Sequence, residues 1–178
     1  SPSPLAGTDM SATTIKVAIA QLLRVNFLNG NTYQGSSLQT VTTQYERYTA
    51  SSRMPRAIVW DENAREELLA GGTINAGVRR NIVPIVIRLV GYSGQGQGGA
   101  ESQGLVFDAL VDAVLHLLRV PANVTLSGAA DVPGYSKVLW QGLNGIQVTK
   151  YFPEERQQFL LYQADIRVDV WEDYDIDS

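Results

Sequence analysis

The sequence predicts a single α+β domain over residues 1–178, with a mostly antiparallel β-sheet and two main α-helices packed on one face of it. Two segments carry apolar residues at helical spacing, and several others are rich in β-branched residues or alternate between apolar and polar side chains. These segments follow one another as helix, strands, helix, strands, which favours an antiparallel sheet over alternating βαβ units. A chain of 178 residues that is 44% hydrophobic and 18% charged can bury one substantial core.

The first helix is expected to begin at Thr13, after a small, polar and proline-containing stretch, residues 1–11, that we interpret as a flexible arm. The helix should extend to Leu28, because apolar residues recur every three or four positions while polar side chains occupy the other face. Its apolar positions include Ile15, Ile19, Leu22 and Leu23. The following Asn29-Gly30-Asn31 takes positive φ readily, so the helix should end there.

The middle of the chain should supply the first strands. Ser36–Ala50, dense in Thr, Val and Tyr, suits a half-exposed strand, and Ala57–Trp60 suits a short apolar one. Asn63–Ala70 is expected to add a turn of helix. Arg79–Tyr92 is the most strongly predicted strand, because its residues are mostly β-branched. Pro84 lies within it and cannot donate to a ladder, so we expect it near a strand start, an edge or a bulge.

A flexible loop is expected over residues 93–103, which are rich in Gly, Gln and Ser, and a second helix over Leu105–Arg119. The apolar face of this helix should include Leu105 and Ala109 as well as the leucines and valines that follow. Three polar residues recur at four-residue steps, so the helix should carry one solvated stripe. The stripe consists of Asp108, Asp112 and His116.

The C-terminal third should consist of strands. Lys137–Gln141 and Ile146–Tyr151 are separated by a stretch whose Asn144-Gly145 pair predicts a hairpin. From Ala164 to Val170 the residues alternate strictly between apolar and polar, which indicates a strand with one face toward the core and one toward water or a partner. Residues 172–178 are interpreted as a solvated acidic tail.

Composition narrows the function classes. The formal net charge of −4 argues against general coating of nucleic acid, which needs clustered cations. The chain has no cysteine, which excludes disulfides, thiolate metal sites and cysteine nucleophiles. No secretory signal is seen at the start, and no apolar run approaches the roughly 18–20 residues of a membrane span. We therefore expect a protein made in the cytoplasm without a membrane partner.

Three patterns that could carry chemistry have simpler interpretations. Gly94, Gly96 and Gly99 match the spacing of a dinucleotide-binding loop, but the predicted loop is too long for a tight turn. No parallel strand is predicted after the second helix either. His116 is the sole histidine and has no serine nucleophile motif, and the Asp173–Asp177 alternation lacks the distal Glu of a calcium loop. We expect no cofactor, no metal and no enzymatic activity, with a nucleotide-dependent α/β enzyme as a distant alternative.

Candidate interface residues come from three places. Arginines near the end of the Thr-rich strand could form a solvated rim or salt bridges between subunits, glutamines of the glycine-rich loop could order against a neighbour, and charged residues alternate along the last strand. The candidates are Arg47, Arg53, Arg56, Gln95, Gln97, Asp165, Arg167 and Asp169.

Taken together, the order of these elements resembles tail-terminator and tail-completion proteins of long-tailed bacteriophages. The resemblance rests on the N-terminal helix, the Thr-rich strand, the long strand, the Gly/Gln/Ser loop, the helix containing Phe107–Val114, and the last predicted strand with its flanks, Tyr162–Trp171. It covers nearly the whole chain as an order of elements, with no invariant chemical motif. Two long stretches depart from the family pattern, Leu28–Ser52 and Val120–Lys137.

The resemblance implies a structural virion protein without an active site. Such subunits form hexameric rings that cap the tail tube, stop its polymerisation and present a surface to the head connector, or stopper, protein. DNA only passes through the lumen, whose negative charge in the family agrees with the acidic balance here. The expected location is the tail or neck of the virion, after assembly in the host cytoplasm. Because of the two departures, a head–tail connector or adaptor and a minor tail protein remain alternatives.

Overall fold

The computed structural model describes residues 12–45, 53–70, 78–94, 100–124, 139–156 and 159–175. Within these ranges the chain has the α+β fold that the sequence predicts. The elements in chain order are α1 (Ala12–Phe27), β1 (Thr40–Thr42), β2 (Arg56–Asp61), β3 (Arg65–Ala70), β4 (Val78–Gly94), α2 (Ala100–Arg119), α3 (Pro121–Val124), β5 (Leu139–Lys150), β6 (Glu154–Arg156) and β7 (Phe159–Asp175).

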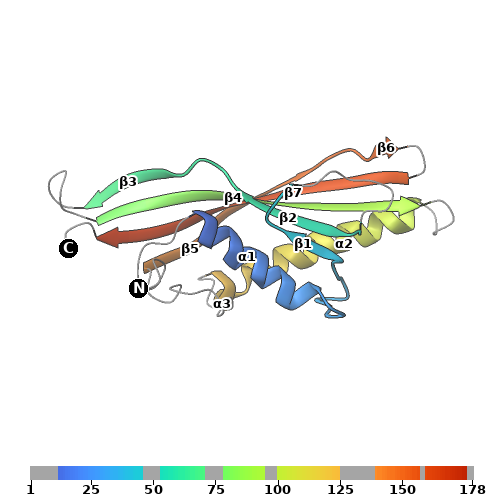
Figure 1. Cartoon of the computed structure of the whole chain (residues 1–178), viewed down its shortest axis with the longest axis horizontal. Helices are drawn as coiled ribbons and strands as arrows, with labels where there is room; N and C mark the ends of the chain where they lie inside the picture. The colour runs from blue at the N-terminus through green and yellow to red at the C-terminus, as the bar shows by residue number, and fades with distance from the viewer. Residues whose placement is uncertain are drawn as a thin grey trace.

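Two 17-residue strands, β4 and β7, form the centre of the sheet and run along the long axis of the molecule (Figure 1). They pair antiparallel from Val78 opposite Asp175 to Gly94 opposite Phe159. The other edge of β4 pairs with β2 and then β3, and the other edge of β7 pairs with β5 and then β6. All these pairs are antiparallel, and among the described strands β1 alone joins its neighbour, β2, in parallel. The sheet is therefore long and narrow, with two shorter strands sharing each flank.

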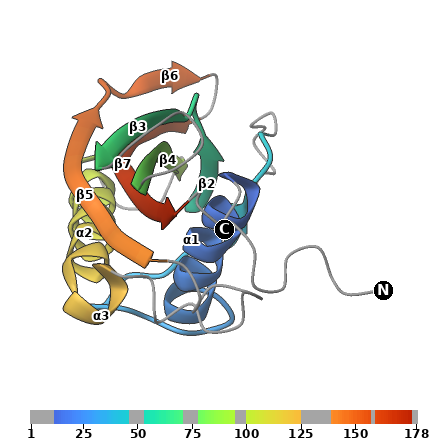
Figure 2. The same cartoon turned by 90° about the vertical axis from the view of Figure 1, so that its left-hand side faces the viewer.

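Both long helices lie on the same face of the sheet, as predicted (Figures 1 and 2). We call this the inner face, and the face turned away from α1 and α2 the outer face. Alternate residues of β4 and β7 point to each, because successive side chains in a strand point to opposite sides. The core between helices and inner face is almost entirely aliphatic; its sheet side includes Val59, Ile85, Ile87, Leu89, Ile166 and Val168.

The end of α1 follows the predicted signal. Asn29 and Gly30 both have positive φ, of 59° and 83°, so the helical ladder cannot continue through them. The Asn31 side-chain amide donates to the carbonyl of Val25 at 3.0 Å, which satisfies a last-turn carbonyl that would otherwise lack a partner. The chain then turns back and Leu38 donates to the carbonyl of Phe27, so the loop after α1 is held against the helix.

Pro84 lies at the centre of β4, yet it removes no ladder hydrogen bond. Its carbonyl accepts from the amide of Glu62 at 2.9 Å, so the backbone polar groups of Pro84 face the flank shared by β2 and β3. Pairing with β2 ends at Ile85 and pairing with β3 begins at Ile82. The residue that has no amide hydrogen thus lies at a local gap in the flank of the central strand β4, and not at the strand start, edge or bulge that the sequence predicted. The gap explains why the sheet tolerates it there.

Two predictions of secondary structure are wrong. Arg65–Ala70 forms β3 and not a turn of helix, because the free flank of β4 beside Val78–Ile82 offers strand pairing that outweighs helix-forming residues. Leu139–Lys150 is one strand, β5, and not a hairpin. Gly145 has a φ of +63° and lies at a register shift between Asn144 and Ile146, so the Asn-Gly pair makes a bulge against the long template β7.

Other boundaries also differ. The Thr-rich strand is limited to β1, and residues 46–50 lie outside the described ranges. The loop predicted over 93–103 is shorter, because β4 continues to Gly94 and α2 begins at Ala100; residues 95–99 are not described. The predicted acidic tail is partly strand, since β7 pairs with β4 as far as Asp175. The N-terminal arm, residues 1–11, lies outside the described residues.

Candidate interaction surface

The outer face is buried at several positions without help from the helices. Ile58, Ile82, Val86 and Val90 are buried there but do not belong to the helix-covered core. The register gives the reason, because each lies directly across from a much larger side chain. The opposed pairs are Ile58 with Arg88, Ile82 with Trp171, Val86 with Trp60, and Val90 with Arg56. Long arginine stems and indole rings can cover their short neighbours, and Arg56 is itself buried in doing so.

An arginine network lies at the middle of the outer face. The Arg88 guanidinium donates from Nε and Nη2 to the two carboxylate oxygens of Asp165, at 2.8 and 2.9 Å. Both side chains are largely buried, 23% and 14% exposed. The guanidinium also lies 5.0 Å from the ring centroid of Trp60 and 6.0 Å from that of Tyr151. A bidentate pair stacked on aromatic rings holds the planar guanidinium in one orientation.

Tyr151 completes this network from the end of β5. Its hydroxyl donates to Oδ2 of Asp165 at 2.9 Å. This hydrogen bond, together with the negative charge of Asp165, raises the pKa of Tyr151 above its ordinary value of 10.0, because both favour the neutral phenol. Two further contacts extend the polar row along the outer face: Arg80 stacks on Trp171 with 4.2 Å to the ring centroid, and Arg167 pairs with Glu62 at 2.7 Å.

The predicted interface residues are not gathered into one patch. Arg47, Gln95 and Gln97 lie outside the described ranges. Arg53 is exposed just before β2, whereas Arg56 is only 4% exposed and belongs to the outer face, so the expected exposed rim does not include it.

The three candidates from the last strand, Asp165, Arg167 and Asp169, do project from the outer face of β7. Asp165 is held within the network by Arg88, so it is not available as a surface charge. The predicted interface residues did not include Arg88, Trp60 or Tyr151, although Arg88 is the only charge inside an otherwise apolar stretch and could have served as the signal.

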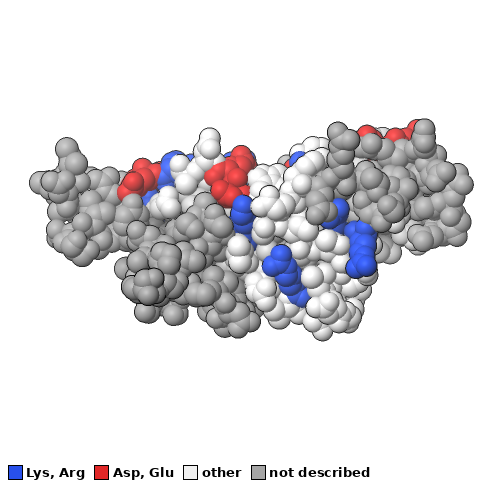
Figure 3. All heavy atoms as spheres, viewed as in Figure 1, with Lys and Arg blue, Asp and Glu red and all other residues white. Residues whose placement is uncertain are grey.

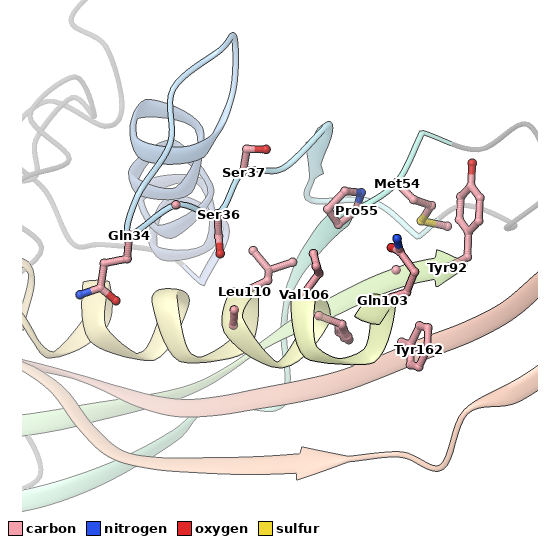
Figure 4. A pocket seen from close by; sticks show the side chains of 14 residues that line it. Gln34, Ser36, Ser37, Met54, Pro55, Tyr92, Gln103, Val106, Leu110 and Tyr162 are labelled. Atoms are coloured by element: carbon pink, nitrogen blue, oxygen red, sulfur yellow. The ribbon is translucent and has the colours of Figure 1, made fainter. Parts of the chain in front are cut away.

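A groove of about 400 Å³ lies beside the first half of α2. Val106 and Leu110 point from the helix toward Ser36 and Pro55, and Met54 and Tyr92 lie at the other end (Figure 4). The remaining lining residues are Gln34, Gly35, Ser37, Gly91, Gln103, Phe107, Ala109 and Tyr162. Its lining combines aliphatic, aromatic and thioether groups with small hydroxyls and amides. These groups suit an apolar side chain or peptide better than an ion.

Large apolar side chains are exposed around this end of the molecule. Leu105 and Val106 on α2 are each more than half exposed, and Ala109 is exposed as well, so the prediction that Leu105 and Ala109 belong to the apolar face of the helix is wrong. Phe152, in the connection between β5 and β6, is 95% exposed, and its neighbour Tyr151 is partly exposed. Nothing in the sequence pattern had identified Phe152. Aromatic side chains standing in solvent on an ordered framework are typical of contact sites for other proteins.

The second half of β5 forms an uncovered edge of the sheet. Every residue from Gly145 to Lys150 except Ile146 is exposed, and in the part of the chain that the structure describes no strand pairs with the side of β5 that faces away from β7. The backbone groups along such an edge can pair with another strand. Val148 is an exposed apolar side chain on this edge.

The residues considered for chemistry do not form a reactive centre in the described structure. His116 Nδ1 lies 2.6 Å from the Tyr33 hydroxyl, a contact that fastens the loop after α1 to α2, and Asp108 and Asp112 are exposed on the same stripe, as predicted. Gly94 ends β4, and Gly96 and Gly99 are not described. Among the described strands, the first one after α2 is β5, which pairs with β7 and not with β4, so these strands do not form the parallel pair that frames a dinucleotide loop.

The described residues contain no group of three or more His, Cys, Asp or Glu placed to hold a metal ion. None of the helices within the described ranges combines the length and apolar character required to cross a membrane. Comparison with known proteins finds no matching family profile and no matching curated protein.

Proposed function

We propose that this chain is a structural subunit that assembles with copies of itself and with other proteins, and specifically a tail-terminator subunit of a long-tailed bacteriophage. The observation that carries the proposal is the uncovered edge of β5 beside exposed Tyr151 and Phe152. The unpaired backbone groups of a sheet edge can pair with another strand, and exposed aromatic side chains on an ordered framework are typical of contact sites for other proteins, which supports the proposal.

The specific class rests on the resemblance of the order of elements to tail-terminator proteins. The long antiparallel sheet with both helices on one face is compatible with it. In this proposal each subunit contributes one patch to the next, so that a closed ring, of six copies by the resemblance, caps the tail tube and meets the head-connector protein. The proposal includes no catalytic step and no cofactor. DNA passes through the lumen of the ring.

The test is to image the purified protein by negative-stain electron microscopy, alone and after mixing with a phage tail-tube protein. Closed rings of one size, and tubes that carry such a ring at one end and stop growing, are expected. Rings that do not bind tubes but bind the portal side of the neck would favour the connector alternative. Solitary chains in both samples, at concentrations where related assemblies form, would contradict the proposal.

A further inference from the structure

The exposed Phe152 and the groove beside α2 lie on opposite flanks of the same helix. Tyr151 and Pro153, the neighbours of Phe152, line a small depression against Gly104 and Asp108, and Lys150 pairs with Asp108 at 3.2 Å. The groove is lined from the other side of α2, by Val106 and Leu110. Because Phe152 is 95% exposed, it does not fill the groove of its own chain.

We propose that Phe152 of one copy inserts into the α2 groove of a second copy. The two features are complementary in kind: one is an apolar aromatic side chain with little cover, and the other is a concave site of mixed lining, with Val106, Leu110 and Pro55 among its apolar residues, whose volume of about 400 Å³ accommodates a phenyl ring. Met54 and Tyr92 supply the soft thioether and the aromatic ring that pack well against a phenyl group.

Charge around the two features is also complementary. Phe152 is followed by Glu154 and Glu155, both exposed on β6, whereas exposed Arg53 directly precedes Met54 of the groove. Figure 3 shows acidic side chains at the β6 end and elsewhere along the upper side of the molecule, and basic side chains over α1 and toward β1. The start of β2, next to Arg53, and β6 lie at the same end of the sheet but on opposite flanks of it. When Phe152 enters a neighbour's groove, its acidic flank approaches the neighbour's arginine, which favours a second copy as the occupant.

The contact is head-to-tail. Each copy uses its β5–β6 corner on one side and its groove on another, so residues on the two partners differ, and repetition of the contact gives a ring if the rotation closes. The inference rests on the proposed self-assembly and adds which surfaces make it. The β5 edge is left for other contacts within the same assembly.

Single substitutions test the contact in sedimentation-velocity experiments. Phe152→Ser removes the inserted ring, and Val106→Glu places a charge in the groove; each is expected to weaken self-association at least about tenfold. The matched controls are Leu105→Glu, an exposed apolar neighbour that does not line the groove, and Val25→Ser, an exposed valine on α1. The controls should assemble like the wild type, and circular dichroism should show that all four variants fold.

A mixture of variants tests the head-to-tail geometry. A chain carrying Val106→Glu and Phe152→p-benzoylphenylalanine has an inserting side chain but no usable groove. A tagged chain carrying Phe152→Ser has an intact groove but no inserting side chain. Irradiation should cross-link position 152 of the first chain to the groove of the second, with Met54 as the main site, and should yield heterodimers only. Cross-links elsewhere, or products larger than two chains, would overturn the inference.

The outcomes separate the two proposals. If the wild type forms rings and Phe152→Ser forms them equally well, the Phe152 contact is wrong while the ring proposal stands. If the wild type remains a single chain at every concentration, both are wrong. If Phe152→Ser and Val106→Glu abolish rings that the controls retain, the contact is established as the one that builds the assembly.

Discussion

The two faces of β4 and β7 are made by alternate residues of the same strands, yet different interactions stabilise them. The inner face presents Ile85, Ile87 and Ile166 to the helices, all fully buried and without polar atoms. The outer face presents Arg88 and Asp165 at adjacent positions, held in place by directional contacts. The inner face depends on apolar area removed from water, whereas the outer face depends on particular partners.

The largest effect is expected on the inner face. Ile166→Ala removes a fully buried side chain that lies opposite Ile87 on β4 and Val148 on β5, and should lower the free energy of unfolding by about 2–5 kcal/mol through lost apolar burial and the cavity left behind. Urea denaturation measures it. Gln147→Ala, an exposed change on β5, is the control and should stay within about 0.5 kcal/mol. Equal effects would mean that the inner face is not the core.

The next effect concerns the Arg88–Asp165 pair. Asp165→Leu leaves a largely buried guanidinium without its carboxylate and should cost about 1.5–3 kcal/mol, the range for hydrogen bonds to charged groups. The double variant Arg88→Leu with Asp165→Leu removes both charges together, so it should cost less than the sum of the two single changes. Additive losses in this double-mutant cycle would show that the pair does not act as a unit, and the contrast between the faces would weaken.

The pH dependence of stability tests the contribution of Tyr151 to the outer face. Its pKa is raised in the folded chain, chiefly by the hydrogen bond to Asp165, so the neutral phenol is favoured by folding. The resulting stability is fully present below the ordinary pKa of about 10 and is lost as the pH rises through the folded-state pKa. Tyr151→Phe should therefore cost about 1 kcal/mol at neutral pH and show a shallower loss of stability above pH 10.

Urea denaturation of the wild type and Tyr151→Phe across alkaline pH, alongside the ultraviolet absorbance of tyrosinate, measures both quantities. Tyr45→Phe, at an exposed tyrosine, provides a comparison for removing one phenol. Parallel stability curves for the wild type and Tyr151→Phe above pH 10 would contradict the assignment of the raised pKa to this contact.

The sequence predicts the inner face well and the outer face poorly. Strict alternation from Ala164 to Val170 and the periodicity of α1 identify the core directly, because burial requires only an apolar side chain at the right period. The Arg88 network joins β2, β4, β5 and β7, so it depends on a register that no local pattern contains. The same limit explains the wrong predictions for β3 and β5. There, pairing with a long neighbouring strand outweighs the local helix and turn signals.

The candidate interaction surface was predictable only in part. Charged residues on the last strand were identified from alternation, but which of them pair inside the chain depends on what lies across from each one. Asp165 faces Arg88 and is held, whereas Arg167 faces Val86 and reaches Glu62 instead. Phe152 gave no periodic signal, because it lies in a connection between two strands, where exposure is set by how the chain turns.

The smallest effect on stability is expected at Arg167. It tests whether solvent reaches this part of the outer face. Its ion pair with Glu62 is short, at 2.7 Å, but the side chains are 44% and 38% exposed. Water screens such a pair, so Arg167→Ala should change the unfolding free energy of the single chain by about 0–1 kcal/mol, and less at high salt. Glu62→Gln should behave alike, because either change removes the same contact.

The same substitution has a different meaning if another subunit covers this part of the outer face. Covering would exclude water from the Arg167–Glu62 pair, so removing one partner would leave an uncompensated charge and weaken assembly while the single chain remains nearly unaffected. Comparing denaturation of the single chain with sedimentation of the assembly therefore distinguishes a solvated pair from an interface pair. A loss above about 2 kcal/mol in the single chain would show instead that the pair is held by the fold, as Arg88 and Asp165 are.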